Sequence, residues 1–206
     1  MHGLFITGTN TGVGKTVIAV KIVNYLVKYK SVKVRKPVET GCMDFAKDAQ
    51  ALAHAAASKE DINTICPFQY TKLASAEDAS HNESEDLFLS DLANACNYNI
   101  NKKDFVVIEG AGGFYSPIAK GVLNSDLAKK LALPVILVVN DELGGINQAL
   151  LAIEAIKNNN LVIKAVVLNQ IEKNNLDNYK YLVKYTNDLI VKFESKEFDR
   201  FLKSLI

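Results

Sequence analysis

The stretch that decides the fold is "GLFITGTNTGVGKTVIAV", residues 3–20, in which an apolar run leads through a glycine-rich turn into a second apolar segment. This order is typical of a strand, a turn and a helix, and the closing "GKT" is typical of a phosphate-binding P-loop. The strict P-loop has four residues between its two glycines, whereas five residues separate Gly8 from Gly14 here. The stretch is either a nucleotide site with altered spacing or an ordinary turn that imitates one.

The residue types in this turn favour a phosphate site. Gly8, Gly12 and Gly14 let the backbone turn sharply and point successive N–H groups at an anion, to which the helix beginning near Gly14 presents its positive end. We expect Lys15 to bridge the outer phosphates and the Thr16 hydroxyl to bind Mg²⁺. Because backbone N–H groups bind the anion, and not one particular glycine, we interpret the altered spacing as a variant of the motif. The residues expected to bind ATP in this stretch are Gly12, Val13, Gly14, Lys15, Thr16 and Val17.

Length and composition favour a single globular domain. The chain has 206 residues, of which 49% are hydrophobic, so we expect one domain over residues 1–206 whose core needs no disulfide or metal. The formal net charge is +1 with both signs mixed along the chain, which argues against nucleic-acid and membrane-surface binding. The longest apolar run, residues 131–139, is too short to span a bilayer. The three cysteines lack metal-ligand spacing, which predicts reduced thiols in a cytoplasmic protein.

Short β-branched runs alternate with longer helical patterns along the chain. This alternation predicts an α/β fold with a doubly wound, mainly parallel sheet and helices on both faces, because the strands are apolar almost throughout. The predicted strands are residues 4–8, 32–38, 104–110, 134–140 and 163–169, and the predicted helices are residues 14–30, 48–57, 84–97, 124–132, 146–159 and 176–187. Residues 61–82 show no strong periodicity, and we expect a long loop there that is either functional or a mere surface excursion.

Two further strand ends carry residues that suit phosphate chemistry. "FVVIEGAGG" ends an apolar strand in Glu109, where a carboxylate can hold a metal ion or its waters; an acid on a solvated strand end is the alternative. "VRKPVETG" places Lys36 at the end of another strand, and parallel sheets bind ligands at the carboxyl ends of their strands, so we expect Lys36 to face the same crevice as Lys15. A solvated lysine is the alternative there. Two lysines near one triphosphate indicate phosphoryl transfer, since positive charge must follow the moving group.

Five segments together resemble the dethiobiotin synthetase family, in the family's order and with its shifted P-loop spacing. They are "TGTNTGVGKT", "KPVETG", "IEGAGGFYSPI", "LPVILVVNDELGGIN" and "VVLNQ", and they cover the chain from Leu4 to about Gln170. The resemblance implies a P-loop NTPase fold, a homodimer, and an ATP- and Mg²⁺-dependent ring closure. The implied substrates are ATP, CO2 or bicarbonate, and 7,8-diaminononanoate. One amine takes up CO2 as a carbamate, ATP phosphorylates the carbamate, and the second amine attacks it to close the ring of dethiobiotin.

The resemblance also implies roles for individual residues. Lys15 and Lys36 are the expected catalytic residues. The expected metal ligands are Thr16, Asp48 and Glu109. The loop before Asp48 is shorter than in many relatives, which leaves Asp44 as an alternative, and Asp48 also suits a simple helix cap. Further ATP contacts are expected from Asp48, Glu109, Gly110, Ala111, Gly112, Asn169 and Gln170.

Substrate contacts are the third set of roles that the resemblance implies. Thr40 is expected to hydrogen-bond the substrate or its carbamate. The glycine-rich start of the helix over residues 146–159 is expected to reach across the dimer interface to the substrate's tail carboxylate, whereas a helix start that only packs is the alternative. The residues in these roles are Thr40, Gly144, Gly145, Ile146, Asn147 and Tyr181.

The sequence departs from the family's pattern at two places. The tail "NDLIVKFESKEFDRFLKSLI" lacks the proline-bearing loop that touches the nucleotide base in the family, so base contacts from this region and strict preference for ATP are open. Gly12 stands where some relatives have an acid. The apolar spacing of the tail predicts a helix that packs on the domain rather than one that seeks a membrane. Its apolar positions are Phe198, Phe201, Leu202, Leu205 and Ile206.

Two other classes share parts of this pattern. A regulatory P-loop ATPase of the partition or cell-division type is the main alternative, but such switches typically carry an additional lysine early in the P-loop, where residues 9–11 are Thr, Asn and Thr. Amidotransferase-like ligases of cobalamin synthesis usually carry a further glutaminase domain, for which 206 residues leave no room. Dethiobiotin synthesis therefore remains the favoured interpretation.

Overall fold

A six-stranded parallel sheet forms the centre of the computed structural model, which describes residues 1–83 and 86–206. The strands lie in the order β10-β9-β8-β1-β5-β2. Their bounds are β1 His2–Gly8, β2 Val32–Arg35, β5 Phe105–Gly113, β8 Val135–Asn140, β9 Ile163–Asn169 and β10 Ile190–Lys192. Each neighbouring pair runs parallel, with Leu4 of β1 opposite Val107 of β5. The predicted α/β fold with a parallel sheet is therefore confirmed.

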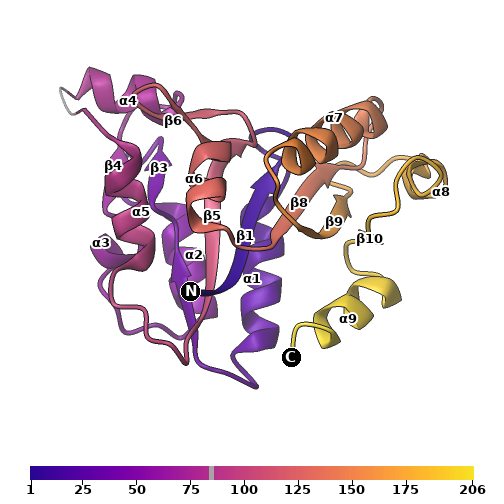
Figure 1. Ribbon diagram of the computed structural model, residues 1–206, viewed down its shortest axis with the longest axis horizontal. Helices are drawn as coiled ribbons and strands as arrows, with labels where there is room; N and C mark the ends of the chain where they lie inside the picture. Colours follow the sequence, from indigo (N-terminus) through magenta and orange to yellow (C-terminus); the bar gives the residue numbers. More distant parts are fainter. Residues whose placement is uncertain (84–85) are drawn as a thin grey trace.

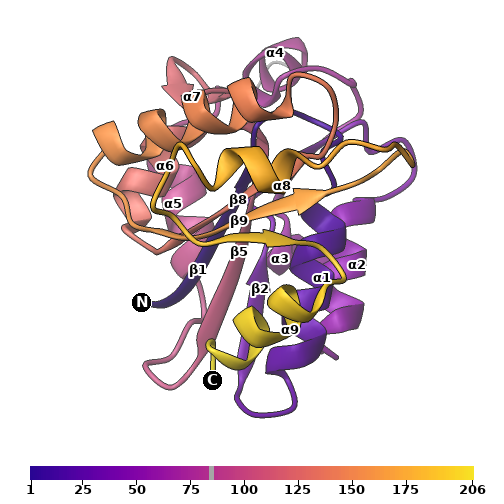
Figure 2. The same ribbon diagram turned by 90° about the vertical axis from the view of Figure 1, so that its right-hand side faces the viewer.

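Helices cover both faces of this sheet, as Figures 1 and 2 show. On β1 the side chains of Leu4 and Ile6 join the core cluster of one face, and Phe5 joins that of the other, because successive strand residues point to opposite sides. The helices packed on the first face are α1 Lys15–Leu26, α2 Lys47–Ala55 and α9 Lys196–Lys203. Those on the second face are α5 Leu89–Asn97, α6 Asn124–Leu131, α7 Gly145–Asn158 and α8 Asn178–Leu182.

The predicted strand over residues 32–38 is two strands in two different sheets. The main-sheet strand β2 ends at Arg35, and β3, Val38–Thr40, pairs in parallel with β4, Phe68–Tyr70. At the junction the Lys36 N–H donates to the carbonyl of Ile65 at 2.9 Å, and Pro37 has no N–H to continue the ladder. The chain therefore leaves the main sheet at Lys36, next to the site described below.

The expectation of an irregular loop over residues 61–82 is wrong. This segment contains a short helix α3, Ile62–Ile65, the strand β4, and the helix α4, Ala76–Asn82. These elements are only three to seven residues long, too short to show a clear hydrophobic period. The predicted helix over residues 84–97 begins at Leu89 in the structure, and its first two predicted positions lie outside the described residues.

Two more features differ from or extend the sequence-based expectations. A small antiparallel hairpin joins β6, Pro117–Ala119, to β7, Val122–Leu123. The predicted helix over residues 176–187 ends at Leu182. The C-terminal helix α9 packs on the domain as predicted, since its apolar side chains Phe198, Phe201 and Leu202 are buried. Beyond the end of the helix, Leu205 is buried and Ile206 is exposed.

Across the described residues, we find no helix that is both long and apolar enough to cross a membrane.

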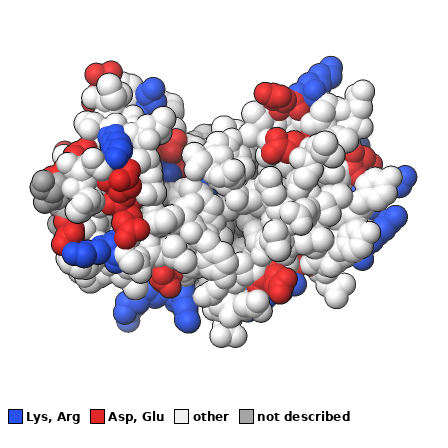
Figure 3. Space-filling view, turned by 90° about the horizontal axis from the view of Figure 1, so that it is seen from above, with Lys and Arg blue, Asp and Glu red and all other residues white. Residues whose placement is uncertain are grey.

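The carboxyl ends of the parallel strands meet at one edge of the sheet. Strand β1 lies in the middle of the sheet, between β5 and β8, and the chain ends lie toward the opposite edge (Figure 1). Seen from above, the molecular surface is hollowed between two raised parts at this edge (Figure 3). In an open parallel sheet such a crevice, where the strand order reverses, is where ligands bind.

Candidate active site

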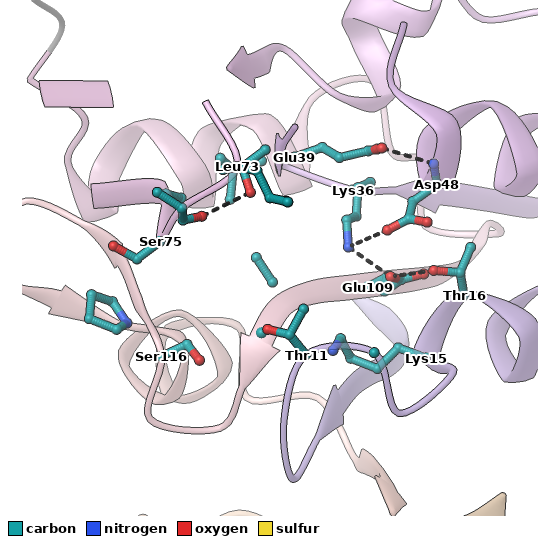
Figure 4. A pocket seen from close by; sticks show the side chains of 18 of the residues that line it. Thr11, Lys15, Thr16, Lys36, Glu39, Asp48, Leu73, Ser75, Glu109 and Ser116 are labelled. Carbon is teal, nitrogen blue, oxygen red and sulfur yellow. Dashed lines mark hydrogen bonds and ion pairs between the residues drawn. The ribbon is translucent and has the colours of Figure 1, made fainter. Parts of the chain in front are cut away.

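A cavity of about 620 Å³ lies at the carboxyl ends of β1, β2 and β5 (Figure 4). It is formed by the β1–α1 turn, the junction after β2, the first turn of α2, the end of β5 and the segment between β4 and α4. Its lining residues are Thr11, Gly12, Gly14–Val17, Lys36, Val38–Thr40, Asp48, Leu73–Ala76, Glu109, Ala111, Gly112, Ser116 and Pro117. Five segments of the chain therefore meet around one hollow.

The β1–α1 turn has the backbone of an anion cradle. Gly12 and Gly14 have φ angles of 78° and 89°, in the left-handed region that favours glycine, and α1 begins directly after Gly14. The helix start has no side-chain cap, so its N–H groups stay available to a ligand. Nζ of Lys15 donates to the carbonyl of Asn10 at 3.0 Å, which folds this side chain back over the turn.

The electrostatic setting of Lys15 fits an anionic partner. Its side chain is buried, and among the described residues it forms no ion pair with a carboxylate. Burial, and after it the nearby charge of Lys36, lowers the pKa of Lys15 to about 8. A bound phosphate group would counteract both effects and stabilise the charged form of Lys15, because it supplies the negative charge that no ion pair with a described residue provides.

A lysine and two carboxylates meet on the other wall of the cavity. Nζ of Lys36 donates to Oε1 of Glu109 at 2.7 Å and to the carbonyl of Gly110 at 3.1 Å, and it lies 3.3 Å from Oδ2 of Asp48. The Thr16 hydroxyl donates to the same Glu109 oxygen at 3.0 Å. Burial disfavours the charged form of Lys36, but the carboxylates of Glu109 and Asp48 outweigh it and raise the pKa of this lysine.

The oxygen atoms of this cluster fit a hard divalent cation. Oε2 of Glu109 is buried and finds no hydrogen-bond partner in the part of the chain that the structure describes, so this oxygen could bind a cation. The Thr16 hydroxyl and the half-exposed Asp48 carboxylate line the same space, and oxygen donors of this kind are those that Mg²⁺ prefers. Among the described residues no group of three or more His, Cys, Asp or Glu side chains is placed to hold a metal by itself. The protein thus offers two carboxylates and one hydroxyl.

The structure brings the P-loop residues, Lys36, Thr40, Asp48 and residues 109–112 to this one place. Of the two acids left open for the metal, Asp48 lines the cavity and pairs with Lys36, whereas Asp44 does not line it. Val13 and Gly110 are buried behind the lining. The side chain of Asn169 lies behind the turn, where its Nδ2 donates to the carbonyl of Val13 at 2.9 Å.

The other predicted site residues lie outside the cavity of this one chain. They are Gln170, Gly144, Gly145, Ile146, Asn147 and Tyr181. Gly144 and Asn147 are exposed at the start of α7, and Tyr181 is exposed on α8. The structure of a single chain therefore brings together the phosphate side of the predicted site and leaves these residues apart from it.

Several lining residues were missed by sequence reasoning. Glu39 stands inside the quoted "KPVETG" but carries no motif meaning of its own, and Ser116 and Pro117 follow the glycine turn after β5. The segment from Leu73 to Ala76 falls in the stretch expected to be an irregular loop. One of the two interpretations of that loop is a functional one, but it names no residue. The Thr40 hydroxyl donates to the Ala74 carbonyl at 3.0 Å, which ties that segment to the site.

Solved structures with this fold include a plasmid partition protein and a cell division protein. A plasmid partition protein from Borrelia burgdorferi is 14% identical with a TM-score of 0.62, covering 100% of this chain and 98% of that one. The cell division protein MinD from Aquifex aeolicus is 16% identical with a TM-score of 0.55, covering 99% of this chain and 86% of that one. At such low identity these likenesses show the fold alone.

Comparisons of sequence are more specific. The AAA_26 family model, described as an AAA domain, matches residues 2–194. A protein named ATP-dependent dethiobiotin synthetase BioD from Vesicomyosocius okutanii is 44% identical, covering 100% of this chain and 97% of its own length. The protein of the same name from Ruthia magnifica is 39% identical over 100% of this chain and 99% of its own length. With this identity over the full chain, and with the family's motifs gathered around one cavity, the chain belongs to the ATP-dependent dethiobiotin synthetase family.

Proposed function

We propose that the protein carboxylates 7,8-diaminononanoate with CO2 and closes the ureido ring of dethiobiotin at the expense of ATP. The observation that carries this proposal is the pairing of Lys36 with Glu109 and Asp48 opposite the P-loop lysine, in a chain 44% identical to a dethiobiotin synthetase. A P-loop alone would support any nucleotide-dependent reaction. A second buried lysine beside the phosphate cradle supports chemistry on a second anion, such as a carbamate.

The proposed reaction has three balanced steps. One amine of the diamine attacks CO2 and loses a proton, which gives a carbamate. A carbamate oxygen then attacks the γ-phosphorus of ATP, and ADP leaves. The second amine attacks the carbonyl carbon of the resulting mixed anhydride and loses a proton, so that a C–N bond forms, the C–O bond to phosphate breaks and phosphate departs. Phosphorylation is needed because a carbamate oxygen is a poor leaving group until it carries the phosphoryl group.

Both lysines are suited to the charge that develops in these steps. Lys15 lies over the P-loop, where its ammonium would stabilise the outer phosphates of ATP, and Lys36 would hold the carbamate and the moving phosphoryl group. Thr16, Asp48 and Glu109 would hold Mg²⁺, which when bound neutralises charge on the phosphate oxygens. Thr40, on the facing wall, would hydrogen-bond the substrate or its carbamate.

We propose that the active protein is a homodimer in which the start of α7 serves the neighbouring subunit's site. Leu143 is 88% exposed, and the adjoining Gly144 and Asn147 are exposed on the same helix start. The Gly145 N–H donates to the Glu142 carbonyl at 3.0 Å, but Gly144 gives the helix start no side-chain cap, so α7 is suited to bind the tail carboxylate of the substrate. Gly145, Ile146 and Tyr181 complete this proposed subsite.

The adenine of ATP is proposed to lie near Asn169 and Gln170, at the end of β9. Asn169 is buried against the P-loop carbonyl of Val13, and Gln170 after it is exposed. Asn169 ends the strand next to β8, and its side chain lies against Gly14, where an added Cβ would meet its Nδ2. The proposed location of the protein is the cytoplasm, where MgATP is available.

Phosphate release tests the proposal against a regulatory ATPase of the partition type. We expect the purified protein to release phosphate from MgATP only when bicarbonate and 7,8-diaminononanoate are both present. Leaving out either one should return the rate to background. A steady ATPase rate without the diamine would contradict the proposal and favour the regulatory ATPase, whose fold this chain shares.

A further inference from the structure

Helix α2 begins without a cap from its own N-cap residue. That residue is Ala46, which has no side-chain acceptor, and the structure shows no side-chain cap bond from it. The N–H groups of the first turn normally donate to such a side-chain acceptor, and leaving a buried N–H unpaired is costly. The N–H groups of Asp48 and Ala49 therefore need an acceptor from elsewhere in the fold.

Glu39 supplies this acceptor from β3, across the cavity wall. Its Oε1 accepts from the N–H of Asp48 at 2.9 Å and its Oε2 accepts from the N–H of Ala49 at 3.0 Å. Glu39 is 8% exposed, so these two bonds lie largely out of water. A carboxylate at this end of a helix also interacts favourably with the helix dipole. Figure 4 shows the Glu39 side chain turned toward Asp48.

The turn that Glu39 holds is the turn that carries Asp48. The backbone N–H of Asp48 is fixed by Glu39, while the carboxylate of Asp48 lies 3.3 Å from Nζ of Lys36. That carboxylate is 39% exposed and has no other ion pair among the described residues, so its direction depends on the backbone beneath it. Residues that hydrogen-bond a metal ligand and fix its orientation commonly affect metal affinity, although they do not contact the metal.

We propose that Glu39 is a positioning residue, whose carboxylate fixes the first turn of α2 so that Asp48 faces Lys36 and the site for Mg²⁺. This inference rests on the proposed function, in which Asp48 is a metal-side acid. The inference predicts that Glu39 affects metal binding. A helix cap that only stabilised the fold would have no such effect.

The first test needs neither metal nor nucleotide. Hydrogen exchange of the intact protein is followed at the amides of Asp48 and Ala49 in the wild type, Glu39→Ala and Glu39→Gln. Asp91→Ala is the matched control, because Asp91 caps α5 through the Phe88 N–H at 2.9 Å and does not line the cavity. We expect exchange in the first turn of α2 to become at least about tenfold faster in Glu39→Ala, with a smaller change in Glu39→Gln and none in the control. Unchanged exchange in Glu39→Ala would overturn the proposal.

The second test separates positioning from a purely structural role. The Mn²⁺ affinity of the nucleotide-bound protein is measured by the paramagnetic signal of free Mn²⁺, and the Mg²⁺ concentration for half-maximal activity is measured beside it. We expect Glu39→Ala and Asp48→Ala each to weaken metal binding about tenfold or more. Because Glu39 acts through Asp48, adding Glu39→Ala to Asp48→Ala should weaken it little further. At saturating Mg²⁺ the kcat of Glu39→Gln should stay close to that of the wild type.

The outcomes distinguish this inference from the proposed function. If Asp48→Ala weakens metal binding but Glu39→Ala does not, or if the two effects add in full, Glu39 does not act through Asp48 and the inference fails alone. If Asp48→Ala leaves metal binding unchanged, the metal role of Asp48 in the proposed function fails, and the inference fails with it.

Discussion

Lys36 keeps its charge because two carboxylates hold it, although it is 3% exposed. Lys15 lines the same cavity without such a partner, and its pKa is lowered rather than raised. The two lysines therefore differ in what compensates their positive charge. The charge of Lys36 is compensated by the protein, whereas that of Lys15 is compensated only when an anion enters the P-loop.

Replacing Lys36 by Met tests its proposed part in the reaction. The change keeps much of the volume but removes the charge, so we expect kcat to fall by roughly 100-fold or more, as when one group that stabilises the transition state is lost. Thermal stability should fall too, since Glu109 is then buried without its cation. The measurements are phosphate release with both substrates and a thermal melt.

Lys120→Met is the control for this variant. Lys120 pairs with Asp86 at 2.7 Å on the surface and does not line the cavity, so its loss should leave kcat unaltered. A Lys36→Met enzyme within threefold of the wild-type kcat would show that Lys36 has no catalytic part.

Gly12 and Gly14 of the P-loop form a matched pair for a second prediction. Both have positive φ angles, so alanine at either position introduces backbone strain of about 1 kcal/mol. A Cβ at Gly12 would meet nothing within 4 Å, whereas a Cβ at Gly14 would collide with Nδ2 of Asn169. That collision would also displace the bond from Asn169 to the Val13 carbonyl.

We therefore expect Gly14→Ala to weaken ATP binding by at least about tenfold more than Gly12→Ala, because only the first variant moves the N–H groups of the cradle. Titration with a fluorescent ATP analogue measures both dissociation constants. Equal constants for the two variants would mean that Asn169 does not support the P-loop.

At the scale of elements, strand β2 is anchored by an ion pair just before the junction at Lys36. Arg35 is fully buried, and its guanidinium donates to Glu60 at 3.1 and 3.2 Å and to the Tyr98 carbonyl at 2.7 Å. Lys33 lies 3.0 Å from the same carboxylate. Burial opposes the charge on Glu60, but hydrogen bonds from Arg35 and Lys33 outweigh it and lower the pKa of Glu60 below its usual range.

This pair predicts a stability that depends on pH. Because the pKa of Glu60 is lower in the folded state, its charged form stabilises the protein above the unfolded pKa of about 4.3, and the effect is lost as the pH falls through the folded value. We expect Glu60→Gln to lower the free energy of unfolding by about 1–3 kcal/mol at pH 7, allowing for the partial contact of Glu60 with water. The difference should shrink at pH 4 and below.

Urea denaturation at pH 7 and at pH 4 measures this difference. Glu154→Gln is the control, since Glu154 is exposed on α7 and forms no ion pair among the described residues, and it should show little change at either pH. A Glu60→Gln difference that stays constant between the two pH values would contradict the assigned role of the carboxylate.

The C-terminal helix is a second element whose role can be measured. Phe198 is fully buried between the rings of Phe193 and Phe201, in the core cluster shared with α1. We expect Phe198→Ala to lower the free energy of unfolding by about 3 kcal/mol and Ile206→Ala, at an exposed position, to change it by less than about 0.5 kcal/mol. Equal urea midpoints for the two variants would show that α9 does not pack as a structural element.

Elements with long apolar runs were predictable, and short ones were not. Strands β1, β5, β8 and β9 were predicted to within a few residues, because buried parallel strands are apolar at nearly every position. Strand β10 has three residues and gives no such signal. The break in the strand at Lys36 depends on a bond to the Ile65 carbonyl, which no local pattern contains.

At the scale of the whole molecule, the predictable part of the site is the part fixed by strand ends. Lys15 comes after the turn that follows β1, Lys36 directly follows β2, and Glu109 stands within β5; a parallel sheet brings residues at such places to one edge. The role of Glu39 was not predictable, because it depends on how β3 packs against the start of α2. The one-domain prediction for residues 1–206 and the homodimer remain predictions.

The most direct test of the central claim follows the carbon atom. The protein is incubated with MgATP, 7,8-diaminononanoate and ¹³C-bicarbonate, and the products are analysed by mass spectrometry. We predict dethiobiotin that carries the label in its ureido carbon, formed together with one ADP and one phosphate per molecule. ATP turnover without labelled dethiobiotin would contradict the account.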